Sequence, residues 1–183
     1  RHFNACPVSM PLVMRTIIAL FCLPVLFIAL PEGGLKFYVL AVLSGMFIGV
    51  ADVFFFRAVA RNGAGVCSRL MGPLIVLSTF FLWLILDYKL ALSYIENPVV
   101  GGGILFSIGL MVFMAFLMRS CHLSLHALKD LMPNIVFLVT AILLTKFMLY
   151  DESWVLSIQI IALQCCAAAL TLFAYKTYKR ENV

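Results

Sequence analysis

Charge is scarce in this sequence: 11% of its 183 residues are charged, whereas 64% are hydrophobic and the mean hydropathy is +1.12. A soluble domain carries about 25% charged and about 45–50% apolar residues. This composition excludes an ordinary soluble domain. It predicts an integral membrane protein whose surroundings are a lipid bilayer, and no nucleic-acid partner is expected.

Motifs that carry catalysis or bind metal are also missing from the sequence. It contains no G-x-S-x-G elbow, H-E-x-x-H helix, glycine-rich phosphate loop or paired inward carboxylates. The six cysteines have no C-x-x-C spacing, which argues against a zinc site or a disulfide framework. His122 and His126 have i, i+4 spacing, but no acidic or cysteine ligand accompanies them at a matching position. We therefore expect no enzyme activity, no metal and no cofactor.

Long apolar runs take up most of the chain. At about 20 residues per membrane-spanning helix, six such runs account for roughly 120 of the 183 residues. The predicted fold class is an all-α integral membrane protein, a bundle of about six transmembrane helices. We expect further helices to precede this segment, because the chain begins at Arg1 and the first run follows almost at once. The predicted spans cover about residues 10–30, 36–58, 64–86, 99–118, 131–150 and 154–175.

Lysine and arginine fall unequally on the two predicted membrane faces. With the N-terminus on face A, ten of the 13 basic residues lie on that face and three lie on face B. By the positive-inside rule face A is cytoplasmic, so both termini and the basic tail at 176–183 are predicted to be inside. The face A residues are Arg1, Arg15, Arg57, Arg61, Arg69, Arg119, Lys129, Lys176, Lys179 and Arg180, and those of face B are Lys36, Lys89 and Lys146.

Three charged residues lie inside apolar runs, where a charge needs a partner, a cavity or water. Counted from face A at about 1.5 Å per residue, Arg15, Asp52 and Arg69 lie at similar depths, each about 5 or 6 residues in. We predict that Asp52 faces the bundle interior within reach of an arginine. The pair is either a structural ion pair or part of a transport path.

Small residues in the runs predict where helices approach one another closely. Gly45-x-x-x-Gly49 in the second span should meet a neighbouring helix. Gly102 and Gly109 in the fourth span are predicted packing positions as well. The sixth span, rich in alanine and cysteine between 162 and 169, should be buried among other helices.

Other residues of the spans have positional roles. Pro73 should kink the third span, because proline removes a backbone donor. Trp83 and Tyr88 are predicted members of the interfacial aromatic belt. Lys146 lies about one turn from the end of its span and is predicted to reach the interface as an anchor.

The segment 10–118 resembles one EamA-type repeat of the drug/metabolite transporter superfamily, from its second helix to its fifth. The matching features are Arg15, Phe55-Phe56-Arg57-Ala58-Val59-Ala60, Ala64-Gly65-Val66, Pro73, Trp83-Leu84, and the glycines Gly101, Gly102 and Gly109. The family usually has a glutamate where Asp87-Tyr88 stands here. Residues 119–175 then supply two further transmembrane helices, which are either extra helices or the beginning of the next repeat.

The resemblance implies a ten-helix carrier built from two inverted five-helix repeats. Its function would be secondary transport of a small metabolite or drug-like solute, and the translocation candidates are Arg15, Asp52, Arg69 and Pro73. The remaining helices would come from sequence outside this segment or from further copies of the chain. The competing hypothesis is a non-transporting helical scaffold or assembly subunit.

Overall fold

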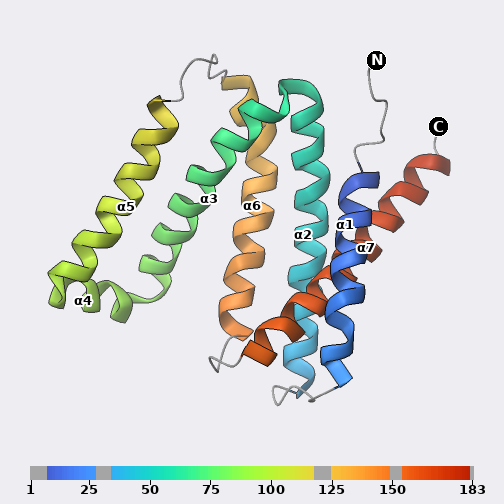
Figure 1. Cartoon of the computed structure of the whole chain (residues 1–183), viewed down its shortest axis with the longest axis horizontal. Coiled ribbons are helices and arrows are strands. Elements are labelled where there is room, and N and C mark those ends of the chain that lie inside the picture. The colour runs from blue at the N-terminus through green and yellow to red at the C-terminus, as the bar shows by residue number, and fades with distance from the viewer. Residues whose placement is uncertain (1–7, 28–33, 118–124, 149–153, 182–183) are drawn as a thin grey trace.

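The computed structural model describes residues 8–27, 34–117, 125–148 and 154–181, and every element in them is a helix (Figure 1). The predicted all-α class is therefore confirmed for the described residues. A short 3-10 helix, η1, follows α1. The elements are α1 (Ser9–Cys22), η1 (Leu23–Phe27), α2 (Gly34–Asn62), α3 (Ala64–Leu86), α4 (Tyr88–Glu96), α5 (Pro98–Leu117), α6 (Leu125–Met148) and α7 (Trp154–Glu181).

Five described segments are long and apolar enough to cross a membrane, which indicates a membrane-embedded helical protein. These segments correspond to the first, second, third, fifth and sixth predicted spans. The fourth predicted span forms α5, of which the apolar stretch Pro98–Met114 is shorter than the other five. The five segments are Ser9–Phe27, Gly34–Asn62, Ala64–Leu86, His126–Met148 and Val155–Lys179.

The stretch 87–97, predicted as a loop, contains the helix α4 instead. Asp87 and Asn97 lie outside the helix, one at each end of it. Between them, nine residues without proline or glycine can form two and a half turns.

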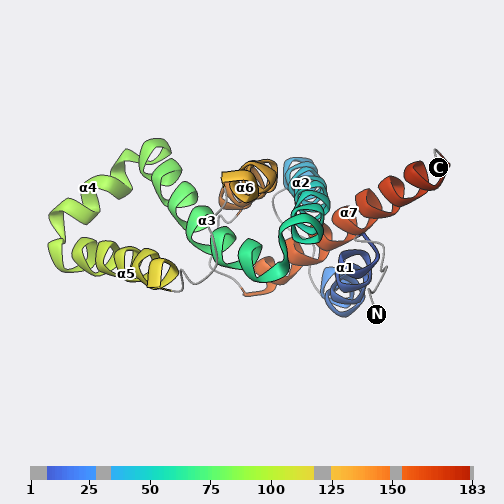
Figure 2. The ribbon, with the colours of Figure 1, turned by 90° about the horizontal axis from the view of Figure 1, so that it is seen from above.

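Helices α2, α6 and α7 form the centre of the bundle, and α2 packs extensively against both of the others. Seen from above, α7 crosses between α1 and α2, so that α1 packs mainly on α7 (Figure 2). On the other side, α3 packs on α6 and leads to α4 and α5, which lie farthest from the centre (Figures 1 and 2). The apolar faces of α1 and α5 are exposed to the surroundings of the bundle.

The predicted close approach at Gly45 and Gly49 is confirmed. A Cβ atom built on Gly45 would lie 2.5 Å from the Gln164 carbonyl oxygen, and one on Gly49 would lie 3.0 Å from the Ala168 carbonyl oxygen. The glycines therefore let α2 touch the backbone of α7 directly. The sixth predicted span is buried as expected, with Ala168 fully covered.

Gly102 and Gly109 do not have the predicted packing role. Among the described atoms, none lies within 4 Å of a Cβ position built on either glycine, and both glycines are exposed. The close contact at this end belongs to Gly101, whose Cβ position lies 2.5 Å from the Tyr94 carbonyl oxygen of α4. Gly101 thus permits the sharp reversal from α4 into α5.

Prolines lie within two of the spans, and the predicted kink at Pro73 stays a prediction. The α-helical part of the first span ends at Cys22, and Pro24 lies in η1, where its missing N–H breaks the α-helical hydrogen-bond pattern. Pro73 lies inside α3, which continues as one helix past it. Figure 1 shows α3 starting beside α6 and diverging from it toward α4.

The start of α1, the junction of α2 with α3, and the end of α7 lie at the same end of the bundle in Figure 1. This end corresponds to face A of the sequence analysis. Arg61 and Asn62 of α2 both bond there to Asp130 of α6, at 3.3 and 2.9 Å. The cytoplasmic location of this face stays a prediction.

Candidate functional site

Arg15 and Asp52 form the charged contact predicted from their depths. Arg15 Nε donates to Asp52 Oδ2 at 2.8 Å, and its Nη2 donates to Oδ1 at 3.2 Å, so the guanidinium meets the carboxylate with two hydrogen bonds. The side chains are 27% and 18% exposed. Two-point contacts of this kind are the strongest ion pairs that proteins form. The geometry neutralises both charges within the apolar bundle.

The surroundings of this pair support a structural role. Helix α7 packs between α1 and α2, and its small residues, which include Ala167 and Ala168, let the arginine reach past that helix to α2. Of the three described cavities, none has Arg15 or Asp52 in its lining. Two hydrogen bonds join Asp52 to Arg15, and Arg69 lies partly buried on α3. A translocation role of Arg15, Asp52, Arg69 and Pro73 stays a prediction.

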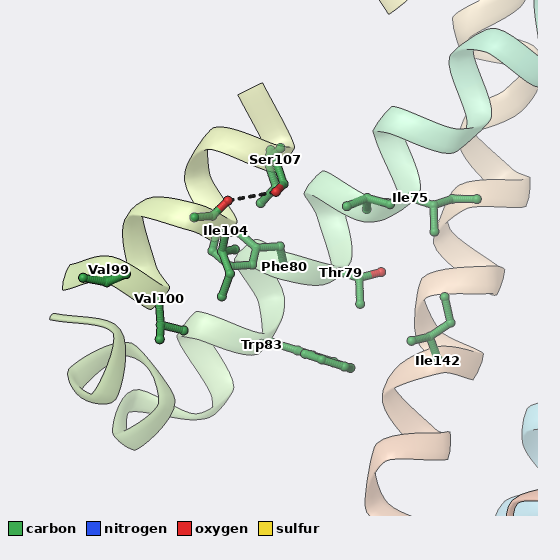
Figure 3. Close-up of a pocket in the computed structure, with 12 residues that line it drawn as sticks. Ile75, Thr79, Phe80, Trp83, Val99, Val100, Ile104, Ser107 and Ile142 are labelled. Carbon is green, nitrogen blue, oxygen red and sulfur yellow. Dashed lines mark hydrogen bonds between the residues drawn. The ribbon is translucent and has the colours of Figure 1, made fainter. Parts of the chain in front are cut away.

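The largest described cavity lies between α3, α5 and α6 and has a volume of about 790 Å³ (Figure 3). We call it the α3–α5 cavity. Its size is within the usual range of about 300–1,000 Å³ for small-molecule sites. Its lining residues are Ile75, Val76, Thr79, Phe80, Trp83, Val99, Val100, Gly103, Ile104, Ser107, Ile108 and Ile142.

Two polar groups in this cavity are unusual. Thr79 and Trp83 point from α3 toward α6 (Figure 3). Among the described residues, neither the buried Thr79 hydroxyl nor the buried Trp83 Nε1 has a hydrogen-bond partner. Leaving a buried donor unpaired costs about 1–3 kcal/mol. Ser107 differs, because its hydroxyl donates to the Gly103 carbonyl at 2.8 Å.

A second cavity of about 490 Å³ lies among α2, α3, α6 and α7, and we call it the lysine cavity. Trp83 and Ile142 line both cavities, so the two share a wall. Lys146 Nζ bonds to Asp87 Oδ2 at 3.0 Å and lies 5.3 Å from the centre of the Trp83 ring. Its ammonium is therefore held between a carboxylate and an aromatic face. The lining residues are Ile48, Trp83, Leu138, Ala141, Ile142, Thr145, Lys146 and Gln164.

A buried polar network joins the lysine cavity to α2. Gln164 Nε2 donates to Ser44 Oγ at 2.8 Å and to Thr145 Oγ1 at 2.7 Å. Ser44 in turn donates to the Ala41 carbonyl, and Thr145 donates to the Ala141 carbonyl. Hydrogen bonds of this kind link membrane helices where no hydrophobic effect drives them together. The network fixes the relative positions of α2, α6 and α7 at one wall of the cavity.

The sequence predicted only some of the roles that the cavity residues have in the structure. The sequence predicted an interfacial position for Trp83 and Lys146, which stays a prediction; it did not predict that both residues line a cavity. Gln164 carried a usable signal, because an amide inside an apolar span requires a partner. Nothing in the sequence distinguished Thr79, since a threonine in a membrane helix commonly donates its hydroxyl to a backbone carbonyl of the same helix. His122 lies outside the described residues.

Comparison with known proteins adds no assignment: no family model, curated protein or solved structure matches the chain.

Proposed function

We propose that this protein is a secondary transporter for a small metabolite or drug-like solute. The observation that supports this most is the pair of cavities that meet at Trp83, within a chain whose helices are long and apolar enough to span a membrane. Polar and charged groups at such a place are costly unless they serve a solute or one another. The chain would be part of an EamA-like fold, as its resemblance implies.

The proposed path runs along the divergence of α3 from α6. One side of Trp83 offers an apolar cavity with two unpaired donors, and the other offers Lys146 and the Gln164 network. A carrier needs a site with both apolar and polar groups. Such a site can replace the water around a solute and still bind the solute weakly enough to release it. Movement of helices α3, α4 and α5 together against α2, α6 and α7 would expose the site alternately to the two membrane faces.

A non-transporting scaffold or assembly subunit is the second candidate. The large apolar side chains exposed on α1 and α5, such as Phe21 and Phe106, would suit contacts with other helices as well as with lipid. Flux separates the candidates. Liposomes loaded with a panel of aromatic and aliphatic carboxylates, ketones, amides and sulfonates should lose at least one of them faster with the protein than without it. A scaffold would leave every rate at that of protein-free liposomes.

We expect face A to be cytoplasmic, because ten of the 13 basic residues are predicted to lie on it. The measurement is labelling of single cysteines, at Lys129→Cys for face A and at Lys89→Cys for face B, in a cysteine-free chain in intact cells. A membrane-impermeant thiol reagent should label Lys89→Cys and spare Lys129→Cys until the membrane is opened. The reverse pattern would overturn the orientation.

A further inference from the structure

The hydroxyl of Thr79 behaves unlike that of any other threonine in the chain. The remaining five hydroxyls each donate to the backbone carbonyl four residues earlier, at 2.8 to 2.9 Å. Among the described residues, the buried Thr79 hydroxyl has no partner at all. It lies on the face of α3 that borders the α3–α5 cavity, so a ligand in that cavity can accept its proton.

Trp83 adds a second donor one helical turn farther along the same face. Residues four apart on a helix are neighbours, so an acceptor between them can be reached by both side chains. Indole Nε1–H can donate but not accept, and a threonine hydroxyl can also donate. The two groups are therefore matched by a hydrogen-bond acceptor such as a carbonyl oxygen, which the acyl chain of a lipid cannot supply.

The rest of the lining determines the body of the ligand. Ile75, Ile104 and Ile142 project into the α3–α5 cavity from three helices (Figure 3). The described lining contains no charged side chain, because Lys146 belongs to the neighbouring cavity and is bonded to Asp87. A phosphorylated or highly hydroxylated solute would lose its hydration here without enough partners.

We infer that the α3–α5 cavity binds a solute with an aromatic or aliphatic body and a hydrogen-bond-accepting oxygen, to which Thr79 and Trp83 donate. The inference rests on the proposed function, because it names the substrate class of that same site. Thr79 and Trp83 select for the oxygen, and the isoleucines accept the apolar body.

The test uses two radiolabelled probes of nearly equal shape, cyclohexyl phenyl ketone and benzylcyclohexane, in which a methylene group replaces the carbonyl. Binding is measured on the protein in nanodiscs, with empty nanodiscs correcting for partition into lipid. The ketone should bind saturably and at least about tenfold more tightly than the hydrocarbon. Thr79→Val and Trp83→Phe, which keep shape but remove a donor, should each weaken ketone binding by about threefold to tenfold, the effect of one hydrogen bond.

Ser107→Ala is the matched control, because Ser107 lines the same cavity but donates its proton to Gly103. It should leave ketone binding unchanged, and Thr79→Ser should retain it. Equal binding of the two probes, which would indicate a site for acyl chains, overturns the inference, as does the absence of saturable binding. So does an unchanged affinity in Thr79→Val. Selective ketone binding without any solute flux would instead overturn the transporter and leave this inference standing.

Discussion

Replacing Gly45 by leucine is expected to be the most damaging single substitution in the chain. Even the first side-chain atom would lie 2.5 Å from the Gln164 carbonyl oxygen and 2.7 Å from Ala167 Cβ. Neither neighbour can move aside, because one is backbone and the other is attached directly to it. Overpacking of this kind costs about 1–3 kcal/mol and sometimes more. We expect the upper end here, since α2 and α7 must separate along their contact.

The measurement is the melting temperature of the purified protein in detergent, followed by loss of its monodisperse size-exclusion peak. Gly45→Leu should yield little folded protein, and what is recovered should melt well below wild type. Gly102→Leu provides the matched control, because no described atom lies within 4 Å of its Cβ position. If Gly45→Leu had the same melting temperature as the control variant, the close packing of α2 on α7 would be refuted.

Asp52→Asn is expected to destabilise the protein by about 3 kcal/mol, the lower end of the cost of breaking a buried ion pair. The amide keeps the volume of the carboxylate but leaves the Arg15 guanidinium without a counter-charge. The lower end applies because the two side chains are 27% and 18% exposed rather than fully buried. Equilibrium unfolding in mixed micelles measures the change in the free energy of unfolding.

A second substitution distinguishes a structural pair from a transport residue. Arg15→Gln on the Asp52→Asn background should restore part of the stability, because it removes the stranded charge. Arg61→Gln serves as the comparison, since Arg61 is 69% exposed and its pair with Asp130 should contribute only about 0–1 kcal/mol. The double variant should also transport solute at a near wild-type rate per folded molecule. Lost flux in that stable double variant would place Asp52 on the path instead.

Sequence reasoning located the Arg15–Asp52 pair because depth in a membrane follows from counting residues along a helix. It also located the Gly45–Gly49 contact, since two small residues one turn apart form a smooth strip on one helix face. It failed at Gly102 and Gly109, where the same residue type lies on a face that meets no described neighbour. The sequence shows that a helix face carries small residues, but only the tertiary structure shows whether another helix packs on that face.

The α3–α5 cavity could not be predicted from the sequence either. Its volume results from the divergence of α3 from α6 and from the reversal through α4, which was predicted as a loop. Thr79 matters because its hydroxyl lacks a partner among the described residues, and this depends on a side-chain torsion that no sequence pattern records. Membrane spans and the Arg15–Asp52 pair were thus predictable, whereas the candidate site required the positions of three helices.

The central claim is that solute crosses the membrane through the α3–α5 cavity, and a tryptophan introduced at one of two adjacent glycines tests it most directly. Gly103 lines the cavity and Gly102 does not, yet neither has a described atom within 4 Å of its Cβ position. Both variants should therefore fold. In liposomes loaded with a solute that the wild-type protein releases, Gly103→Trp should lower the initial efflux rate at least about tenfold, and Gly102→Trp should leave it near wild type. Equal rates in the two folded variants would contradict transport through this cavity.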